Sequence, residues 1–423
     1  MTYSQENENM QPCIKSELSL FDPPMVQVIA EKALWADIHP TSSIESGSGP
    51  IEFLISGSQE DYLDLNDTIL YLRLKVVKSL GSDLAIDTKI YPANLLLASL
   101  FDDVSLTLNG TMIEGGHHLY PYKAIMTSLL QFNTETKKTQ LRAAGFEEDK
   151  TDREKWLASS KSLELMGPLF LDFLSQSKYL LPGVDVRLKL SRSKLDFCLM
   201  NDGKESMKML IEQATLYVRR VKCSPSVLLG HEIGLKSSNA IYPIQQSEML
   251  SFTIPKGSKS HVQDNLLRGL LPKLLIIGLV GNEAFNGKKD KDPTLFDHFD
   301  LNFISLYRDG ECVPYSQPLQ PDYANGLAAQ AYMRTIQALE QYNSNISHGI
   351  TLSDFVNNGR TLYAMNLTPD MNASGACGQP YRTSNLRLEL KFSKSLPETI
   401  NVVIFAIRDG KVEITQDRQI LKQ

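Results

Sequence analysis

The stretch GPIEFLISGSQEDYLDLNDTILYLRLKVVK, residues 49–78, carries two kinds of signal. Apolar and polar residues alternate on both of its flanks, which is typical of β-strands with one buried and one solvated face. Its middle holds four carboxylates within eight positions, at Glu60, Asp61, Asp64 and Asp67. The fold and the question of catalysis both depend on whether this cluster is a metal site, a catalytic site or an acidic turn between two strands.

The spacing of these carboxylates does not match a metal loop. A calcium-binding loop needs Asp or Asn at alternate positions, then a Gly and a late Glu. The segment EDYLDLND, residues 60–67, spaces its carboxylates differently, contains no Gly, and interleaves Tyr62, Leu63 and Leu65. Because Asp and Asn side chains bind nearby backbone N–H groups in turns, we predict an acidic turn between two strands, with no metal and no catalytic role.

Charge, cysteine content and the N-terminus narrow the class of protein. A formal net charge of −6 argues against a large basic surface for nucleic acid. No CxxC pair is present, so we expect reduced thiols rather than a disulfide framework or a zinc site. The N-terminal MTYSQENENMQP is polar and acidic, unlike a secretory signal. The five cysteines are Cys13, Cys198, Cys223, Cys312 and Cys377.

Strand patterns dominate the rest of the chain. The most apolar run, residues 266–281, is interrupted by charges and a proline, which predicts buried strand rather than a membrane span. Period-two alternation recurs in residues 184–192 and 385–393. Asn-Gly or Asp-Gly pairs at 109–110, 309–310 and 409–410 predict tight hairpins. Apolar residues at helical spacing predict helices within 120–132 and 326–343 that dock onto a sheet. The charged stretches 145–156 and 286–293 are predicted to be solvated loops.

Self-comparison reveals a repeat at one offset. Residues 101–113 resemble residues 301–313, which aligns Leu106 with Leu306. VRLKLSRSK at 186 and LRLELKFSK at 386 share five of nine positions at the same offset. A third match pairs IEFLISG at 51 with LSFTIPK at 250, at an offset of 199. Three matches in the same order predict two consecutive copies of one β domain.

We therefore predict an all-β chain of two tandem jelly-roll β-sandwiches, a double jelly roll, with a few short helices in long loops. The long connections are expected at about 115–183 and 314–384. An immunoglobulin-like sandwich is the competing fold, but its copies are nearer ~100 residues long. The predicted division is an N-terminal arm and entry segment at 1–44, a first jelly roll at 45–222, a linker at 223–237 and a second jelly roll at 238–423. Residues 1 to about 30 lack periodicity, so we expect them to be ordered only by contact with a neighbouring subunit or the inner side of a shell.

Other candidate sites fail on spacing. LVGNEAFNGKKD places five residues between Gly281 and Gly287, whereas a phosphate loop needs four and then Lys-Ser or Lys-Thr. The adjacent His117 and His118 would point to opposite sides of a strand, which does not suit a pair of metal ligands. We predict no catalytic, cofactor-binding or metal-binding residues, no cofactor and no enzymatic activity.

Long motifs in both halves resemble the major capsid proteins of Polinton (Maverick) elements and the related adintoviruses. The first half carries KSELSLFDPPMVQVIAEKALWADIHP, then residues 49–76, LFDDVSLTLNGTMI, YPYKAIMTSLL and KKTQLRAAGF. The second half carries the similar stretch from Ile241 to Gly287. The resemblance runs from about residue 14 to 415, which is nearly the whole chain.

The resemblance implies a hexon, which is a trimeric double jelly-roll protein that forms pseudo-hexagonal homotrimers and tiles an icosahedral virus-like shell. It implies self-association, then trimer–trimer contacts, and penton and minor capsid proteins as further partners. It implies no small-molecule substrate and no sequence-specific nucleic acid. The implied location is the capsid of a virion, with synthesis inside the host cell and no secretion. The alternatives are a non-enzymatic, lectin-like jelly-roll binding module and a domesticated capsid homologue.

Overall fold

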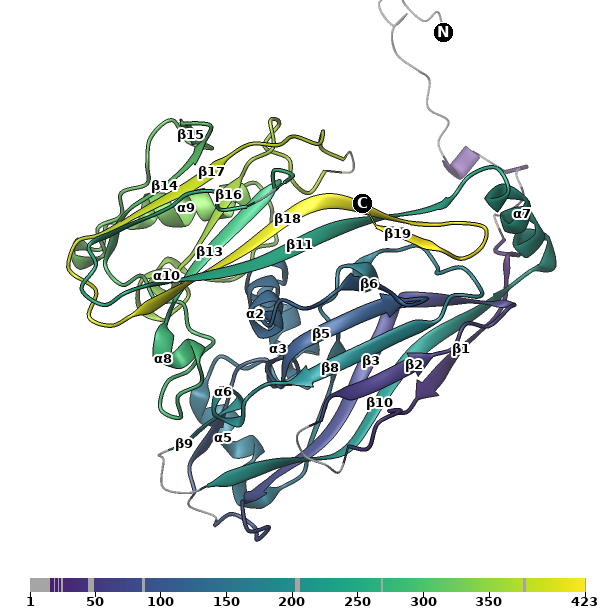
Figure 1. Ribbon diagram of the computed structural model, residues 1–423, viewed down its shortest axis with the longest axis horizontal. Coiled ribbons are helices and arrows are strands. Elements are labelled where there is room, and N and C mark those ends of the chain that lie inside the picture. The colour runs from purple at the N-terminus through teal and green to yellow at the C-terminus, as the bar shows by residue number, and fades with distance from the viewer. Residues whose placement is uncertain are drawn as a thin grey trace, which may run out of the picture.

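The computed structural model describes residues 16–18, 20–21, 23, 26–44, 49–85, 88–201, 206–267, 269–375 and 378–422. Two β-sandwiches lie beside each other, with helix α2 between them (Figure 1). The chain is mostly β-sheet with short helices, as predicted. Within the described residues, no helix combines the length and apolar character needed to cross a membrane.

The first sandwich consists of two four-stranded antiparallel sheets, ordered β1-β10-β3-β7 and β2-β8-β5-β6. Long strands of alternating pattern form its core, in which Phe53, Leu72 and Leu188 are fully buried. A short pair, β4 with β9, lies outside these two sheets. The strands are β1 (Ala30–Ile38), β2 (Ile51–Ile55), β3 (Asp61–Lys78), β4 (Ile90–Pro92), β5 (Phe101–Leu108), β6 (Thr111–Glu114), β7 (Leu163–Pro168), β8 (Val186–Arg192), β9 (Leu199–Asn201) and β10 (Met207–Cys223).

The second sandwich repeats this plan, with sheets ordered β11-β18-β13-β16 and β12-β17-β14-β15. A short strand, β19, pairs with the end of β18. The apolar run predicted to be buried strand contains β13, in which every residue is buried. The strands are β11 (Ala240–Ile254), β12 (Ser260–Gln263), β13 (Leu274–Gly281), β14 (Leu301–Arg308), β15 (Glu311–Val313), β16 (Leu362–Asn366), β17 (Leu386–Phe392), β18 (Ile400–Ile414) and β19 (Ile420–Lys422).

The two sandwiches have the same topology. Counting eight sheet strands in each, both give the orders 1-8-3-6 and 2-7-4-5, which is the arrangement of a jelly roll. The register also repeats, because Leu106 pairs with Leu188 and Leu306 pairs with Leu388. Both fourth strands even carry the same irregularity after their first residue, between Phe101 and Asp103 and between Leu301 and Phe303. A register shift at the same position of equivalent strands strongly supports a duplication.

One of the three sequence matches is nevertheless wrong. Ile51–Ile55 forms β2, the second strand of its sandwich, whereas Leu250–Ile254 is the end of β11, the first strand of the other. Strand β2 is instead equivalent to β12. Alternation reports which side of a strand is buried and not which strand it is, so two short amphipathic segments matched by chance.

Two further expectations need correction. The segment Ala30–Ile38, predicted to belong to the entry segment of residues 1–44, is strand β1 and pairs with β10. As an edge strand it is exposed along most of its length, so it lacks the alternation that marks a half-buried strand. Asp409-Gly410 is no hairpin, because it lies inside β18 opposite Gln245 and Ile244. Most of the predicted arm, including residues 1–15, lies outside the described residues.

The helices occupy the connections between strands. The predicted helices appear as α2 and α9, and the predicted linker at 223–237 contains α7. Each long connection also contributes one sheet strand, β7 or β16. The helices are α1 (Leu96–Ser99), α2 (Tyr120–Gln131), α3 (Thr134–Lys138), α4 (Gln140–Ala143), α5 (Lys150–Trp156), α6 (Leu195–Cys198), α7 (Pro225–Leu235), α8 (Asn282–Phe285), α9 (Ala329–Ala338) and α10 (Leu352–Asn357), with 3-10 turns at Ser16–Leu18, Ala158–Ser160, Phe173–Ser175 and Tyr323–Asn325.

Leucines at equivalent positions of the two jelly rolls should contribute similarly to the free energy of unfolding. Leu106 and Leu306 are both fully buried, so we expect Leu106→Ala and Leu306→Ala each to lower the free energy of unfolding by about 2–5 kcal/mol through the cavity left behind. Leu80→Ala, at a leucine that is 98% exposed, is the matched control and should have little effect. Urea titrations of the full chain measure the free energy of unfolding. If either Leu106→Ala or Leu306→Ala lowered it no more than Leu80→Ala does, the two positions would not be equivalent.

Candidate functional site

The acidic cluster that opened the sequence analysis does not form the predicted turn. Asp61, Asp64 and Asp67 all lie in β3, and only Glu60 belongs to the link that precedes it. The Arg219 side chain, on β10, contacts Asp64 Oδ2 and Asp67 Oδ2 at 2.7 Å each. Lys222, three pairs further along β10, contacts Glu60 at 2.8 Å. The carboxylates therefore neutralise cations of the neighbouring strand.

A local irregularity of β3 explains this arrangement. Tyr217 pairs with Ile69 and Arg219 pairs with Asp64, so four residues of β3 oppose one residue of β10. The extra residues bring Asp64 and Asp67 to the same guanidinium. Burial raises the pKa of Asp64, while Arg219 and the backbone N–H groups of Asn66 and Asp67 act to lower it. In the part of the chain that the structure describes, no group of three or more His, Cys, Asp or Glu side chains is placed to hold a metal ion.

The two adjacent histidines do not form a ligand pair. His118 has a positive φ, and its Nδ1 is 2.5 Å from Asp102 Oδ2 in an exposed hydrogen bond. His117 is exposed. The prediction that this protein has no catalytic, cofactor or metal residues stays a prediction.

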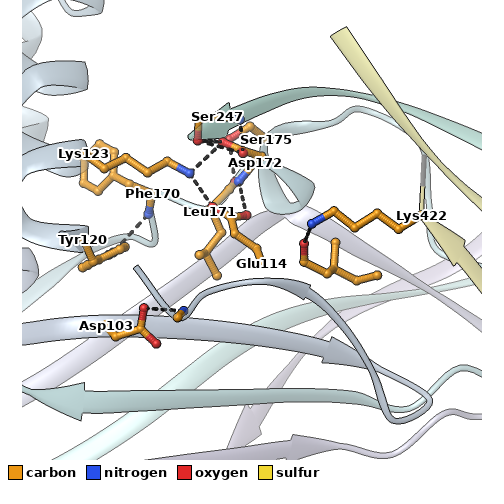
Figure 2. A network of polar contacts seen from close by, with 12 residues as sticks. Asp103, Glu114, Tyr120, Lys123, Phe170, Leu171, Asp172, Ser175, Ser247 and Lys422 are labelled. Atoms are coloured by element: carbon orange, nitrogen blue, oxygen red, sulfur yellow. Dashed lines mark hydrogen bonds and ion pairs between the residues drawn. The ribbon is translucent and has the colours of Figure 1, made fainter. Parts of the chain in front are cut away.

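The structure instead draws attention to buried polar groups where the two jelly rolls meet (Figure 2). Lys123, on α2, donates hydrogen bonds to Glu114 of β6 and to Asp172, the latter at 2.7 Å. The second oxygen of the Glu114 carboxylate accepts from the backbone N–H of Asp172 at 2.7 Å. These three residues come from the first jelly roll and are joined in one cluster.

Ser247, on β11 of the second jelly roll, completes this cluster. Its backbone N–H donates to Asp172 Oδ2 at 2.6 Å, and its hydroxyl reaches both oxygens of the same carboxylate at 2.8 Å. Lys422, on β19, donates to the carbonyl of Ile113 at 2.6 Å and adds a second contact between the jelly rolls (Figure 2). We call Lys123, Glu114, Asp172 and Ser247 the central clamp.

The electrostatics of the central clamp follow from its burial. All three charged side chains are no more than 13% exposed. Burial alone would lower the pKa of Lys123, but the facing carboxylates of Glu114 and Asp172 raise it above its ordinary value, so the ammonium stays charged. Burial raises the pKa of Glu114, and Lys123 opposes that rise. A cavity of about 720 Å³ between the jelly rolls borders Lys123, Asp172 and Ser247.

A second buried ion pair joins two stretches that were predicted to be solvated loops. Arg153, on α5 within 145–156, contacts Asp292 within 286–293 at 3.0 Å, and both side chains are almost fully buried. Arg153 also donates to the carbonyl of Pro92 at 2.7 Å, and Asp292 accepts from Thr294. Although burial opposes it, contact with Arg153 and Thr294 leaves the pKa of Asp292 below its ordinary value. The prediction of solvated loops was wrong for these two residues. Each stretch is highly charged, and the sequence of one stretch does not indicate that the other packs against it.

A third contact holds Lys137 of α3 against the second jelly roll. The Lys137 ammonium donates to the carbonyls of Leu129 and His348, at 2.7 and 2.6 Å. Burial lowers the pKa of Lys137 to about 8. Burial, reinforced by the nearby Lys137, lowers the pKa of His348 to about 4, and its neutral Nδ1 accepts from the Ile350 N–H at 3.0 Å.

These three contacts lie on different elements, so together they fix the angle between the jelly rolls. Their charged groups bind one another, backbone groups and the hydroxyls of Ser247 and Thr294. Sequence reasoning missed all of them. Lys123 lies on the predicted docking helix of residues 120–132, and a lysine within an otherwise apolar stretch was the one signal that could have marked it.

Comparisons with known proteins agree with this architecture. No protein-family model matches the sequence. An uncharacterized protein of Caenorhabditis elegans is 24% identical over 391 residues, which covers 88% of this chain and 93% of that protein.

Among solved structures, the chain is similar to one of the Sputnik virophage, with a TM-score of 0.64 and 12% identity over 98% of this chain and 93% of that one. It is also similar to the mavirus major capsid protein, with a TM-score of 0.55 and 11% identity over 98% of this chain and 96% of that one. The faustovirus major capsid protein has a TM-score of 0.61 and 9% identity, over 94% of this chain and 92% of that one. The fold is a double jelly roll.

Breaking the central clamp should be costly. Lys123→Met leaves Glu114 and Asp172 buried without their cation, so we expect the free energy of unfolding to fall by about 3–5 kcal/mol. Lys155→Met removes an exposed lysine that pairs with Asp152 at the surface, and it should cause no measurable change. Chemical denaturation of the full chain compares the two, and equal stability of both variants would contradict the role of the clamp.

Acid should weaken the contact at His348. The pKa of His348 is about 4 in the folded chain, below its ordinary 6.5, so the unfolded chain binds the extra proton between these values. The contribution of His348 to stability is therefore complete above pH 6.5 and is lost as the pH falls toward 4. His348→Asn should flatten the dependence of unfolding free energy on pH in that window.

The control for this experiment is His39→Asn, at an exposed histidine. It should leave the slope of the parent protein unchanged. A slope for His348→Asn that equals the parent slope between pH 4 and 6.5 would contradict the assignment.

Proposed function

We propose that this chain is a non-enzymatic major capsid protein, a hexon, that forms homotrimers and tiles an icosahedral shell. The observation that carries the proposal is the double jelly roll itself, which matches the mavirus major capsid protein over 98% of this chain. The identity of 11% relates the folds alone, so the function rests on the geometry that follows. Membership among Polinton or adintovirus capsid proteins is part of the proposal and rests on the motifs of both halves.

The geometry suits a threefold assembly. Two sandwiches of the same topology present two similar outer faces. Three such chains around a threefold axis place six near-equivalent sandwiches in a ring, whose footprint is close to hexagonal. Closed cyclic symmetry also limits association through the faces within the trimer. The central clamp, the Arg153–Asp292 pair and the Lys137 contact hold the angle between the sandwiches, on which such a ring depends.

The second long connection supplies surface for a trimer contact. Leu327, Tyr342 and Ile346 lie in it and are 67%, 57% and 63% exposed in the single chain. Large apolar side chains exposed on a single chain are typical of interaction sites when they lie together. We propose that these connections interlock between subunits, and that pentons and minor capsid proteins are further partners. On this proposal the protein resides in the capsid after synthesis inside the host cell.

The predicted domain boundaries remain part of this proposal, with the first jelly roll extended to include β1. The relative in Caenorhabditis elegans supports a related alternative, in which the chain is a domesticated capsid homologue encoded in an animal genome. The lectin-like binding module has no comparable observation in its favour.

Native mass measurement of the full recombinant chain is the decisive experiment. We expect a species three times the 47.4 kDa chain mass, because an obligate interface commonly buries ~2,000 Å² or more. Ile346→Asp should shift the population toward monomer, since a carboxylate would be buried in the apolar contact. Leu80→Asp, at an exposed leucine on the turn after β3, should remain trimeric.

A stable wild-type monomer at micromolar concentration would contradict the hexon proposal and favour the binding module. If the Ile346→Asp variant remained trimeric, the hexon proposal would stand, but the proposed contact through Ile346 would be wrong. Electron microscopy of the trimer at high concentration then tests whether it forms shells.

A further inference from the structure

One end of the first jelly roll exposes an unusual amount of apolar surface. Helix α7 lies there beside the start of β1 (Figure 1). The segment before β1 exposes Leu20, Phe21, Val26 and Val28 by 73–96%. We call the described residues of 17–29 the arm. Such exposure in a soluble chain indicates a contact that a single chain does not make.

A groove lies directly beside the arm. It has a volume of about 910 Å³ and runs between α7, the start of β11 and the segment before β8. Its walls are formed by Tyr62, Leu181, Leu235 and Tyr242, all of which are largely buried. The Tyr62 hydroxyl is held at 2.7 Å by His231 Nδ1 of α7, which fixes the helix against the sheet. The groove is therefore a formed apolar receptor.

The root of the arm is fixed at the rim of this groove. The carbonyl of Ile29 accepts a hydrogen bond from the N–H of Ser224, which immediately precedes α7, at 2.9 Å. The Gln27 side chain accepts from the N–H of Ala30 at 2.9 Å. Gln27, Ile29 and Ala30 line the groove, whereas Leu20 and Phe21 do not.

We propose that the arm of one chain docks into this groove on a second copy of the chain, with Leu20 and Phe21 as its apolar anchors. The proposal deepens the proposed function, on which it rests, by naming a contact between subunits. A chain of ten residues, the length from Leu20 to Ile29, can span up to roughly 33 Å when fully extended, which is enough to reach a neighbouring copy. Each chain carries both the apolar segment and a receptor, so such contacts can link one copy to the next.

The sequence charge of residues 1–29, which include the arm, disfavours a lipid surface as the partner of the arm. Residues 1–29 contain Glu6, Glu8, Glu17 and Asp22 against Lys15. Membrane-binding segments instead use clusters of Lys and Arg to approach anionic lipids. A protein surface is the better match for an acidic segment with apolar anchors.

Cross-linking between two differently labelled chains tests the proposal. The variant Phe21→Cys is mixed with Gly230→Cys, both as full-length proteins, and treated with a short bis-maleimide. Gly230 lines the groove, and a Cβ added there meets no atom within 4 Å from outside its own helical turn, so the substitution fits the fold. We expect a linked pair of chains joining residues 21 and 230, located by peptide mass spectrometry.

The matched control replaces Phe21→Cys with Leu80→Cys, which is equally exposed but lies on the turn after β3. Its yield with Gly230→Cys sets the background, including any reaction of the native cysteines. Adding Leu20→Ala to the Phe21→Cys chain should lower the specific yield by about tenfold, the effect of losing one buried leucine contact.

A yield no higher than the Leu80→Cys background would overturn the inference. A further sample uses a single chain that carries both Phe21→Cys and Gly230→Cys. If this chain is linked only within itself, and the mixed single variants are not linked, the inference is also overturned, because the arm would then fill its own groove. Native mass separates the two proposals. A trimer without the 21–230 link rejects only the arm contact, whereas a stable monomer rejects the hexon itself.

Discussion

The relative orientation of the two jelly rolls depends on one buried cation. Lys123 holds Glu114 and Asp172 together, and the same Asp172 carboxylate accepts both hydrogen bonds that Ser247 sends from the second jelly roll. The carboxylate of Asp172 can therefore bind the second jelly roll only while Lys123 compensates its charge. A buried ion pair adds little net stability over an apolar contact, but an incomplete one is very unfavourable. The clamp thus selects one angle between the sandwiches more than it strengthens their contact.

The fixed angle between the jelly rolls allows the two similar sandwiches to present one constant outline. Both halves repeat the strand order, the Leu106–Leu188 and Leu306–Leu388 register and the same ladder irregularity. Two similar sandwiches at a variable angle would present different outlines in different molecules. Two similar sandwiches at one angle present a constant outline, as a tiled shell requires. The insertions that differ between the halves supply the apolar surfaces by which copies can recognise each other.

The acidic segment at residues 60–67 shows why composition misleads. Four carboxylates in eight residues suggest chemistry, yet each of Asp64 and Asp67 is paired with Arg219 of a strand about 150 residues away. Spacing alone argued against a metal loop here, and that expectation stays a prediction. The predicted turn was wrong because an irregular strand and a turn place Asp and Asn in similar local patterns.

The sequence by itself determined the fold class, because period-two alternation and a 200-residue offset are local signals that survive without any partner. It determined helices α2 and α9, the hairpins at Asn109 and Asp309 and the buried strand β13 for the same reason. It could not find β1, since an edge strand that is exposed on both faces has no alternation to detect. Only the tertiary structure decided the contacts between the jelly rolls. Asp172, Arg153 and Lys137 are ordinary charged residues in the sequence, and their partners Ser247, Asp292 and His348 lie 75, 139 and 211 positions away. Whether a charge is solvated or compensated by a distant group is a property of the folded chain alone.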